Sequence, residues 1–221
     1  MKYLLLVLSL ATPLTSEAQS AASIRSAIRL FDRLTGSAID LSDARLKQMA
    51  DHLESKHALE AALIATQDPY FYELTIRHMA SPSSNKDGAY DVPLNDFIAT
   101  LVGIVRDDLD ARLLLTGDFR YEGKASLALP AVTRSDNNHY VQLEATPGPL
   151  STKIEKKSPQ WPDAPSAGVL TTRAWAESHY SGGTNRRAIQ MTFQEFACRN
   201  LNQIADTQIN DFYVRRDVDR S

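Results

Sequence analysis

The chain contains almost no cysteine and carries little excess charge. Cys198 is the only cysteine among 221 residues, so the chain cannot form an internal disulfide bond and must be stabilised by packing. With 24 basic and 27 acidic residues the formal net charge is −3, which gives no electrostatic reason to expect nucleic acid or an anionic membrane as a partner. Cys198 stands beside the apolar face of a predicted helix, and we interpret it as a buried, inert thiol.

Long hydrophobic runs are also scarce. The clearest one, Leu4 to Leu14, follows Lys2 and is too short to span a bilayer permanently. Small residues stand after it at Ser16 and Ala18, which completes the three-part pattern of a secretory signal. We predict a signal peptide at residues 1–18, and therefore a periplasmic or secreted protein with no stable membrane span after cleavage. The alternative is a buried N-terminal helix.

Motifs that bind metals, phosphate or covalent haem are missing. None of the five histidines has the spacing of a metal site, and the hydrolase elbow G-x-S-x-G is absent. Gly182-Gly183-Thr184 lacks the Lys-Ser/Thr sequel of a phosphate loop. Covalent haem needs C-x-x-C-H, which one cysteine cannot provide. We expect no metal and no cofactor in this chain, with haem possible only if such a motif follows Ser221.

Apolar residues at helical spacing dominate the first half of the chain. They predict a helix at Ser23–Thr35 that ends at Gly36, and a strong helix at Leu94–Val105, with shorter helices between and after them. The last of these stops at Gly117. Because the predicted connections are short, we expect residues 19–117 to form an N-terminal helical bundle.

Proline becomes frequent after this region. Five of the ten prolines fall between Thr146 and Ser166, and only short, weak strands are predicted upstream of them. We predict that residues 118–166 form an irregular connector, either a linker or a strap laid over the bundle. Trp161 favours the strap, because an indole gains from burial.

Two helices joined by a glycine hinge are predicted at residues 167–210, followed by a charged tail at 211–221. Thr171 or Thr172 can cap the first helix, and the second carries an apolar face of Ile189, Phe193, Phe196 and Ala197. The predicted fold is therefore mainly α, an irregular helical bundle with a long proline-rich strap and a C-terminal helix–glycine hinge–helix unit.

Polar side chains gather at this hinge, and they form the candidate binding site: His179, Thr184, Asn185, Arg186 and Arg187. Both arginines fall in the first turn of the second helix, where a cation faces the positive end of the helix dipole. That placement predicts an anionic partner, either a bound anion or a carboxylate of the chain itself. We favour the internal carboxylate, since arginine pairs with protein carboxylates so often.

Several short blocks, taken in order, resemble uncharacterised exported bacterial proteins. Their helical domains of unknown function precede a C-terminal C-x-x-C-H segment, as in c-type cytochromes. In such proteins a haem motif follows the last block, so either the sequence is truncated before that motif or this member lacks the haem; the resemblance implies no catalytic residue. The blocks are FDRLTG at 31–36, PLNDF at 93–97, GIVRD at 103–107, LLTGDFRY at 114–121, AGVLTT at 167–172, GTNRR at 183–187 and FAC at 196–198.

Two hypotheses of function remain open. The first, which we favour, is a non-catalytic helical module of the cell envelope: the haem-less front part of a cytochrome-like electron-transfer protein, with another envelope protein as its partner. The second is an exported enzyme that acts on an anionic or carbohydrate substrate at a hinge around His179 and Arg186. The enzyme hypothesis requires these two side chains to converge in a concave pocket.

Overall fold

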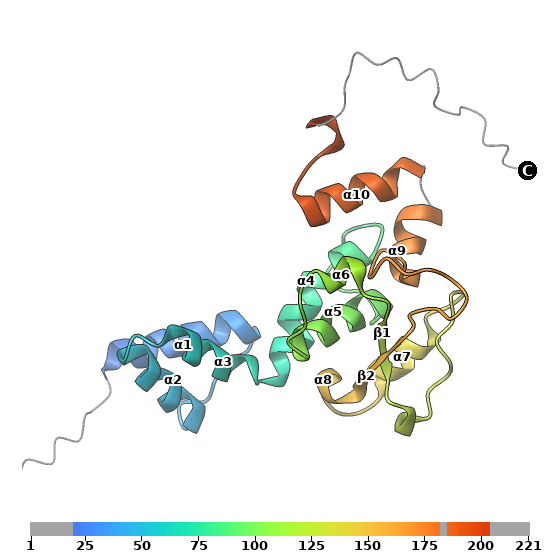
Figure 1. Ribbon diagram of the computed structural model, residues 1–221. Helices are drawn as coiled ribbons and strands as arrows, with labels where there is room; N and C mark the ends of the chain where they lie inside the picture. Colours follow the sequence, from blue (N-terminus) through green and yellow to red (C-terminus); the bar gives the residue numbers. More distant parts are fainter. Residues whose placement is uncertain (1–19, 182–184, 204–221) are drawn as a thin grey trace, which may run out of the picture. The chain divides into compact units, whose positions relative to one another are not determined.

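The computed structural model describes residues 20–181 and 185–203, which form a mainly α protein (Figure 1). Ten α-helices and one two-stranded sheet lie in this part of the chain, which confirms the predicted fold class. No helix in it is both long enough and apolar enough to cross a membrane. The predicted signal peptide, the Gly182-Gly183 hinge and the charged tail lie outside the described residues.

The chain divides into two compact units between Asp68 and Pro69. The first contains α1 (Ala21–Thr35), α2 (Ala44–Glu54) and α3 (Ala58–Thr66). Helix α1 begins where the Ser20 side chain accepts the amide of Ser23, and it ends as predicted at Gly36, which takes the left-handed conformation at φ 67°.

A small core of its own holds this first unit together. The Arg45 guanidinium lies 5.2 Å from the centre of the Phe31 ring and pairs with Asp43 at 2.7 Å and Asp68 at 2.8 Å. One arginine therefore links the start of α2 to the residue that closes the unit. The buried apolar residues are Ala27, Phe31, Ile39, Leu46, Met49, Ala50, Ala61 and Ala65.

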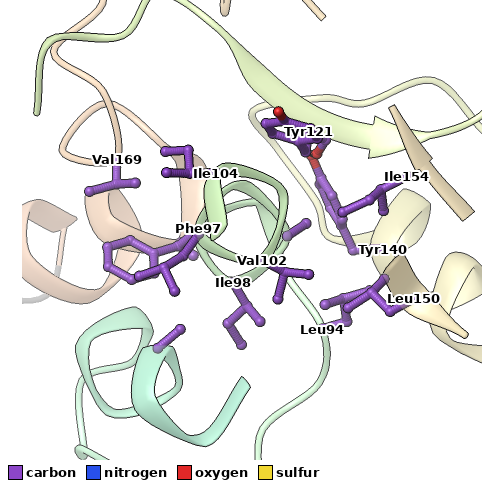
Figure 2. Packing of buried hydrophobic residues seen from close by; sticks show 14 of the residues in the cluster. Leu94, Phe97, Ile98, Val102, Ile104, Tyr121, Tyr140, Leu150, Ile154 and Val169 are labelled. Atoms are coloured by element: carbon purple, nitrogen blue, oxygen red, sulfur yellow. The ribbon is translucent and has the colours of Figure 1, made fainter. Parts of the chain in front are cut away.

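The second unit is built around α5 (Asp96–Arg106), and every residue of this helix from Asp96 to Ile104 is buried. Figure 2 shows its apolar side chains pointing in several directions into the surrounding elements. The antiparallel strands β1 (Arg120–Gly123) and β2 (Ile154–Lys157) pair with Tyr121 opposite Lys156. Tyr121 is fully buried among these residues, so the short sheet contributes directly to the core.

Short helices complete the second unit. The π-helix η1 (Phe71–Ile76) continues into α4 (Arg77–Ala80) and the 3₁₀ turn η2 (Pro82–Ser84). The others before the last helical pair are α6 (Leu113–Thr116), η3 (Ala125–Leu127), α7 (Asn138–Ala145) and α8 (Leu150–Lys153).

The segment 118–166 is more ordered than the irregular connector that we predicted. It contains both strands, α7 and α8, and its Tyr121, Tyr140 and Leu150 enter the core. Trp161 is buried, as the strap interpretation required. The predicted bundle of residues 19–117 is also divided, because α1 to α3 belong to the first unit and α5 and α6 to the second.

The C-terminal pair consists of α9 (Arg173–Ala176) continued by the π-helix η4 (Glu177–Ser181), then α10 (Asn185–Ala197) and the turn η5 (Leu201–Gln203). Thr172, one of the two predicted capping residues, caps α9, and Trp175 is fully buried.

Helix α10 turns only part of its predicted apolar face inward. Ala188 is buried, and Met191 and Phe196 pack against the core, whereas Ile189 is 55% exposed and Phe193 38% exposed. The inward face therefore keeps Phe196 of the predicted face but has Ala188 and Met191 in place of Ile189 and Phe193. Cys198 is exposed just beyond the helix, so the prediction of a buried thiol was wrong.

Candidate functional site

His179 lies inside the protein, on η4. Its side chain is 1% exposed, and its ring centre is 4.2 Å from that of Trp175. Its Nε2 lies 3.2 Å from the carbonyl oxygen of Ser83, and because a carbonyl only accepts, Nε2 carries the proton. Burial lowers the pKa of His179, so the neutral ring is favoured. Nδ1 has no hydrogen-bond partner among the described residues.

The neighbouring contacts fasten the two C-terminal helices to the loop around η2. The Ser178 hydroxyl is 3.1 Å from the carbonyl of Ser84, and the Ser83 hydroxyl donates to Glu195 of α10 at 2.8 Å. Arg187 donates from Nη2 to the carbonyl of Lys86 at 2.9 Å. We predicted an anion or a carboxylate as the partner of Arg187, but the structure gives it a main-chain oxygen.

Asp96 is a buried carboxylate that sequence reasoning did not single out. It accepts hydrogen bonds from the amides of Arg173, Ala174 and Phe97, and so joins the start of α5 to the start of α9. Burial raises its pKa, while these donors oppose the rise. An aspartate in the first turn of a helix is common, so its sequence position does not reveal the second helix that it holds.

An open pocket of about 490 Å³, which we call the Tyr180 pocket, lies beside α9 and η4. Its most accessible aromatic group is Tyr180, 53% exposed, and Trp161 contributes a largely buried indole. The Arg173–Glu177 ion pair also belongs to its wall. The lining residues are Arg134, Ser135, Trp161, Thr171, Thr172, Arg173, Ala176, Glu177, Tyr180 and Ser181.

Trp161 is fixed between two arginines. The guanidinium carbon of Arg120 lies 5.1 Å from the Trp161 ring centre and that of Arg134 lies 4.6 Å from it. The indole nitrogen donates to the carbonyl of Thr171 at 3.0 Å. Arg134 also holds Asp163 through both terminal nitrogens, at 2.9 and 2.6 Å. This side of the pocket is therefore pre-organised and close to neutral.

A second pocket of about 420 Å³ shares Arg173 and Glu177 with the first. Three amide side chains, from Asn85, Asn95 and Asn137, line it, so we call it the asparagine pocket. The Asn137 amide nitrogen donates to the carbonyl of Leu94 at 2.7 Å, while its side-chain oxygen has no partner in the described part of the chain. The Arg173–Glu177 pair therefore lines both the Tyr180 pocket and the asparagine pocket.

Of the five predicted site residues, the structure describes the side chains of His179 and Arg187, and both contact carbonyls of the loop around η2. His179 and Arg187 line neither of these two pockets, and Thr184 and the side chains of Asn185 and Arg186 lie outside the described residues. Within residues 20–181 and 185–203, no group of three His, Cys, Asp or Glu side chains could hold a metal ion. In comparisons with known proteins, no family, no curated protein and no solved structure matches this chain.

Proposed function

We propose that the chain is a non-catalytic helical module of an exported protein, located in the cell envelope. It forms the haem-less front part of a cytochrome-like electron-transfer protein and contacts another envelope protein. One observation supports the non-catalytic role above all others: His179 and Arg187, the two candidate side chains that the structure describes, both hydrogen-bond to main-chain carbonyls of the loop around η2. The cytochrome setting is supported by the resemblance of the sequence blocks.

A catalytic histidine must reach the proton that it moves, directly or through one water. His179 is enclosed by Trp175 and the Ser83 carbonyl, and it lines neither the Tyr180 pocket nor the asparagine pocket. The alternative of an enzyme at a hinge around His179 and Arg186 therefore has no supporting observation among the described residues.

Two measurements test this proposal. N-terminal sequencing of the protein recovered from the periplasm is expected to begin at Gln19, after removal of residues 1–18. Sequencing the gene beyond the codon for Ser221 is expected to show an in-frame C-x-x-C-H motif, and the protein is expected to carry covalent haem. A stop codon at that point would remove the cytochrome part of the proposal, and an uncleaved N-terminus would remove export.

A further inference from the structure

We propose that the Tyr180 pocket binds a neutral saccharide. The pocket uses side chains other than those that contact the loop around η2, and the inference does not rest on the electron-transfer role. The pocket volume of about 490 Å³ falls within the range of small-molecule sites, about 300–1,000 Å³. Its lining combines one accessible aromatic ring with hydroxyl, guanidinium and carboxylate groups.

Tyr180 supplies the apolar surface of the site. Its side chain is 53% exposed although it belongs to η4, whose neighbouring residues Ser178 and His179 are buried. An exposed aromatic ring has a negative face that attracts the polarised C–H groups of a sugar ring. Tyr180 is therefore placed to contact the apolar face of a saccharide, while the rest of the pocket meets its hydroxyl groups.

The Arg173–Glu177 pair supplies both kinds of hydrogen-bonding group. Arg173 donates from Nη1 to Glu177 Oε2, so Nη2 of the guanidinium and Oε1 of the carboxylate are not used in this pair. The Glu177 side chain is 66% exposed. A sugar hydroxyl both donates and accepts, so two adjacent hydroxyls match a free donor beside a free acceptor.

The charge balance of the pocket favours a neutral ligand over an anion. Its two arginines are already paired, Arg134 with Asp163 and Arg173 with Glu177. A phosphate, sulfate or acidic sugar would have to displace one of these carboxylates or bind beside it. A polyhydroxylated neutral ligand can use the remaining hydrogen-bonding capacity without breaking either ion pair.

The test uses the full chain and two neutral disaccharides, cellobiose and chitobiose. Trp161 lines the pocket whereas Trp175 is fully buried, and these are the only two tryptophans, so tryptophan fluorescence reports on ligand binding. We expect a saturable change with at least one disaccharide. Tyr180→Ala and Glu177→Ala are each expected to weaken binding by about tenfold or more.

Matched variants separate binding from folding. Tyr90→Ala removes another exposed tyrosine, and Glu60→Ala another exposed glutamate; neither lines the pocket, and both variants are expected to keep the affinity of the unchanged chain. All four variants are compared by thermal unfolding. The proposal is overturned if neither disaccharide binds, if the Tyr180→Ala protein folds and binds as before, or if glucuronate or sulfate binds more tightly than both disaccharides.

Discussion

Asp96 is a buried carboxylate held by main-chain amides. Its three donors come from α5 and from the first turn of α9, so the side chain closes the distance between segments 77 residues apart. Such a group is costly to remove, because its partners are left without an acceptor in a place that excludes water.

Asp96→Ala is therefore expected to lower the free energy of unfolding by about 1–3 kcal/mol, because the amides of Arg173 and Ala174 lose their acceptor. Urea unfolding measures the change. Asp87→Ala, at an exposed aspartate of the same unit, is expected to stay within about 0.5 kcal/mol of the unchanged protein. If the two substitutions change the free energy of unfolding equally, the buried carboxylate of Asp96 does not stabilise the fold.

His179 makes stability depend on pH. Burial sets its folded-state pKa below the usual 6.5, so as the pH falls the unfolded chain takes up this proton first. We expect the free energy of unfolding to decrease from about pH 6.5 down through the folded pKa. His179→Gln keeps a donor for Ser83 but does not titrate, and it should flatten that dependence, whereas His78→Gln at an exposed histidine should leave it unchanged.

The candidate site could be predicted from sequence only in part. The residues of the hinge were found because they are close in the chain, but their roles depend on the loop around η2, about one hundred residues earlier. The Tyr180 pocket was missed because Arg134, Trp161 and Tyr180 come from three separate segments. The spacing of Arg173 and Glu177, four residues apart, was the one available signal.

At the scale of elements, α5 is packed too tightly for its glycine to be replaced. A Cβ atom built on Gly103 would lie 2.2 Å from the Tyr121 ring. That ring cannot move freely, since it is buried and its hydroxyl donates to Asp107. Helix α5 and strand β1 can therefore pack this closely because residue 103 is a glycine and has no side chain.

Gly103→Ala tests this packing, because two effects of opposite sign compete. Alanine favours a helix over glycine by about 1 kcal/mol, but overpacking a core costs about 1–3 kcal/mol. With a contact this short we expect net destabilisation, measured by urea unfolding. Combining it with Tyr121→Leu should cost less than the sum of the two single changes, since the smaller side chain makes room. If the free-energy changes of the two single variants simply add in the double variant, the strain does not arise from contact between residue 103 and Tyr121.

Element prediction succeeded where the apolar pattern was long. The helices at Ala21–Thr35 and Asp96–Arg106 lie within two residues of their predicted limits. The segment 118–166 was misjudged because its strands and α8 are four residues long and α7 is eight, which is shorter than the windows that reveal a period. Its buried Tyr121, Tyr140 and Leu150 meet through pairing between segments that no local pattern shows.

At the scale of the whole molecule, the two units have separate cores, so we expect them to differ in their free energies of unfolding. The first unit has a small core of eight buried apolar residues, with Phe31 the largest of them, while the second is organised around α5. Small units bury a smaller fraction of their surface and are correspondingly marginal. The first unit is thus expected to open more readily.

Phe31→Ala is expected to remove about 3–5 kcal/mol from the first unit. Hydrogen exchange followed by mass spectrometry should then show faster exchange in α1 to α3 than in α5. Phe97→Ala provides the reciprocal case, with faster exchange in the second unit. If Phe31→Ala speeds exchange equally along the whole chain, the two cores unfold as one.

The exposed position of Cys198 has a practical consequence. As the only thiol of the chain, standing just after α10, it accepts a single maleimide dye or nitroxide spin label without any engineered cysteine. The Arg199 amide donates to the carbonyl of Phe193 at 3.0 Å, so a reporter at the neighbouring Cys198 lies near Phe193, and its signal would register a molecule that binds at this end of the helix.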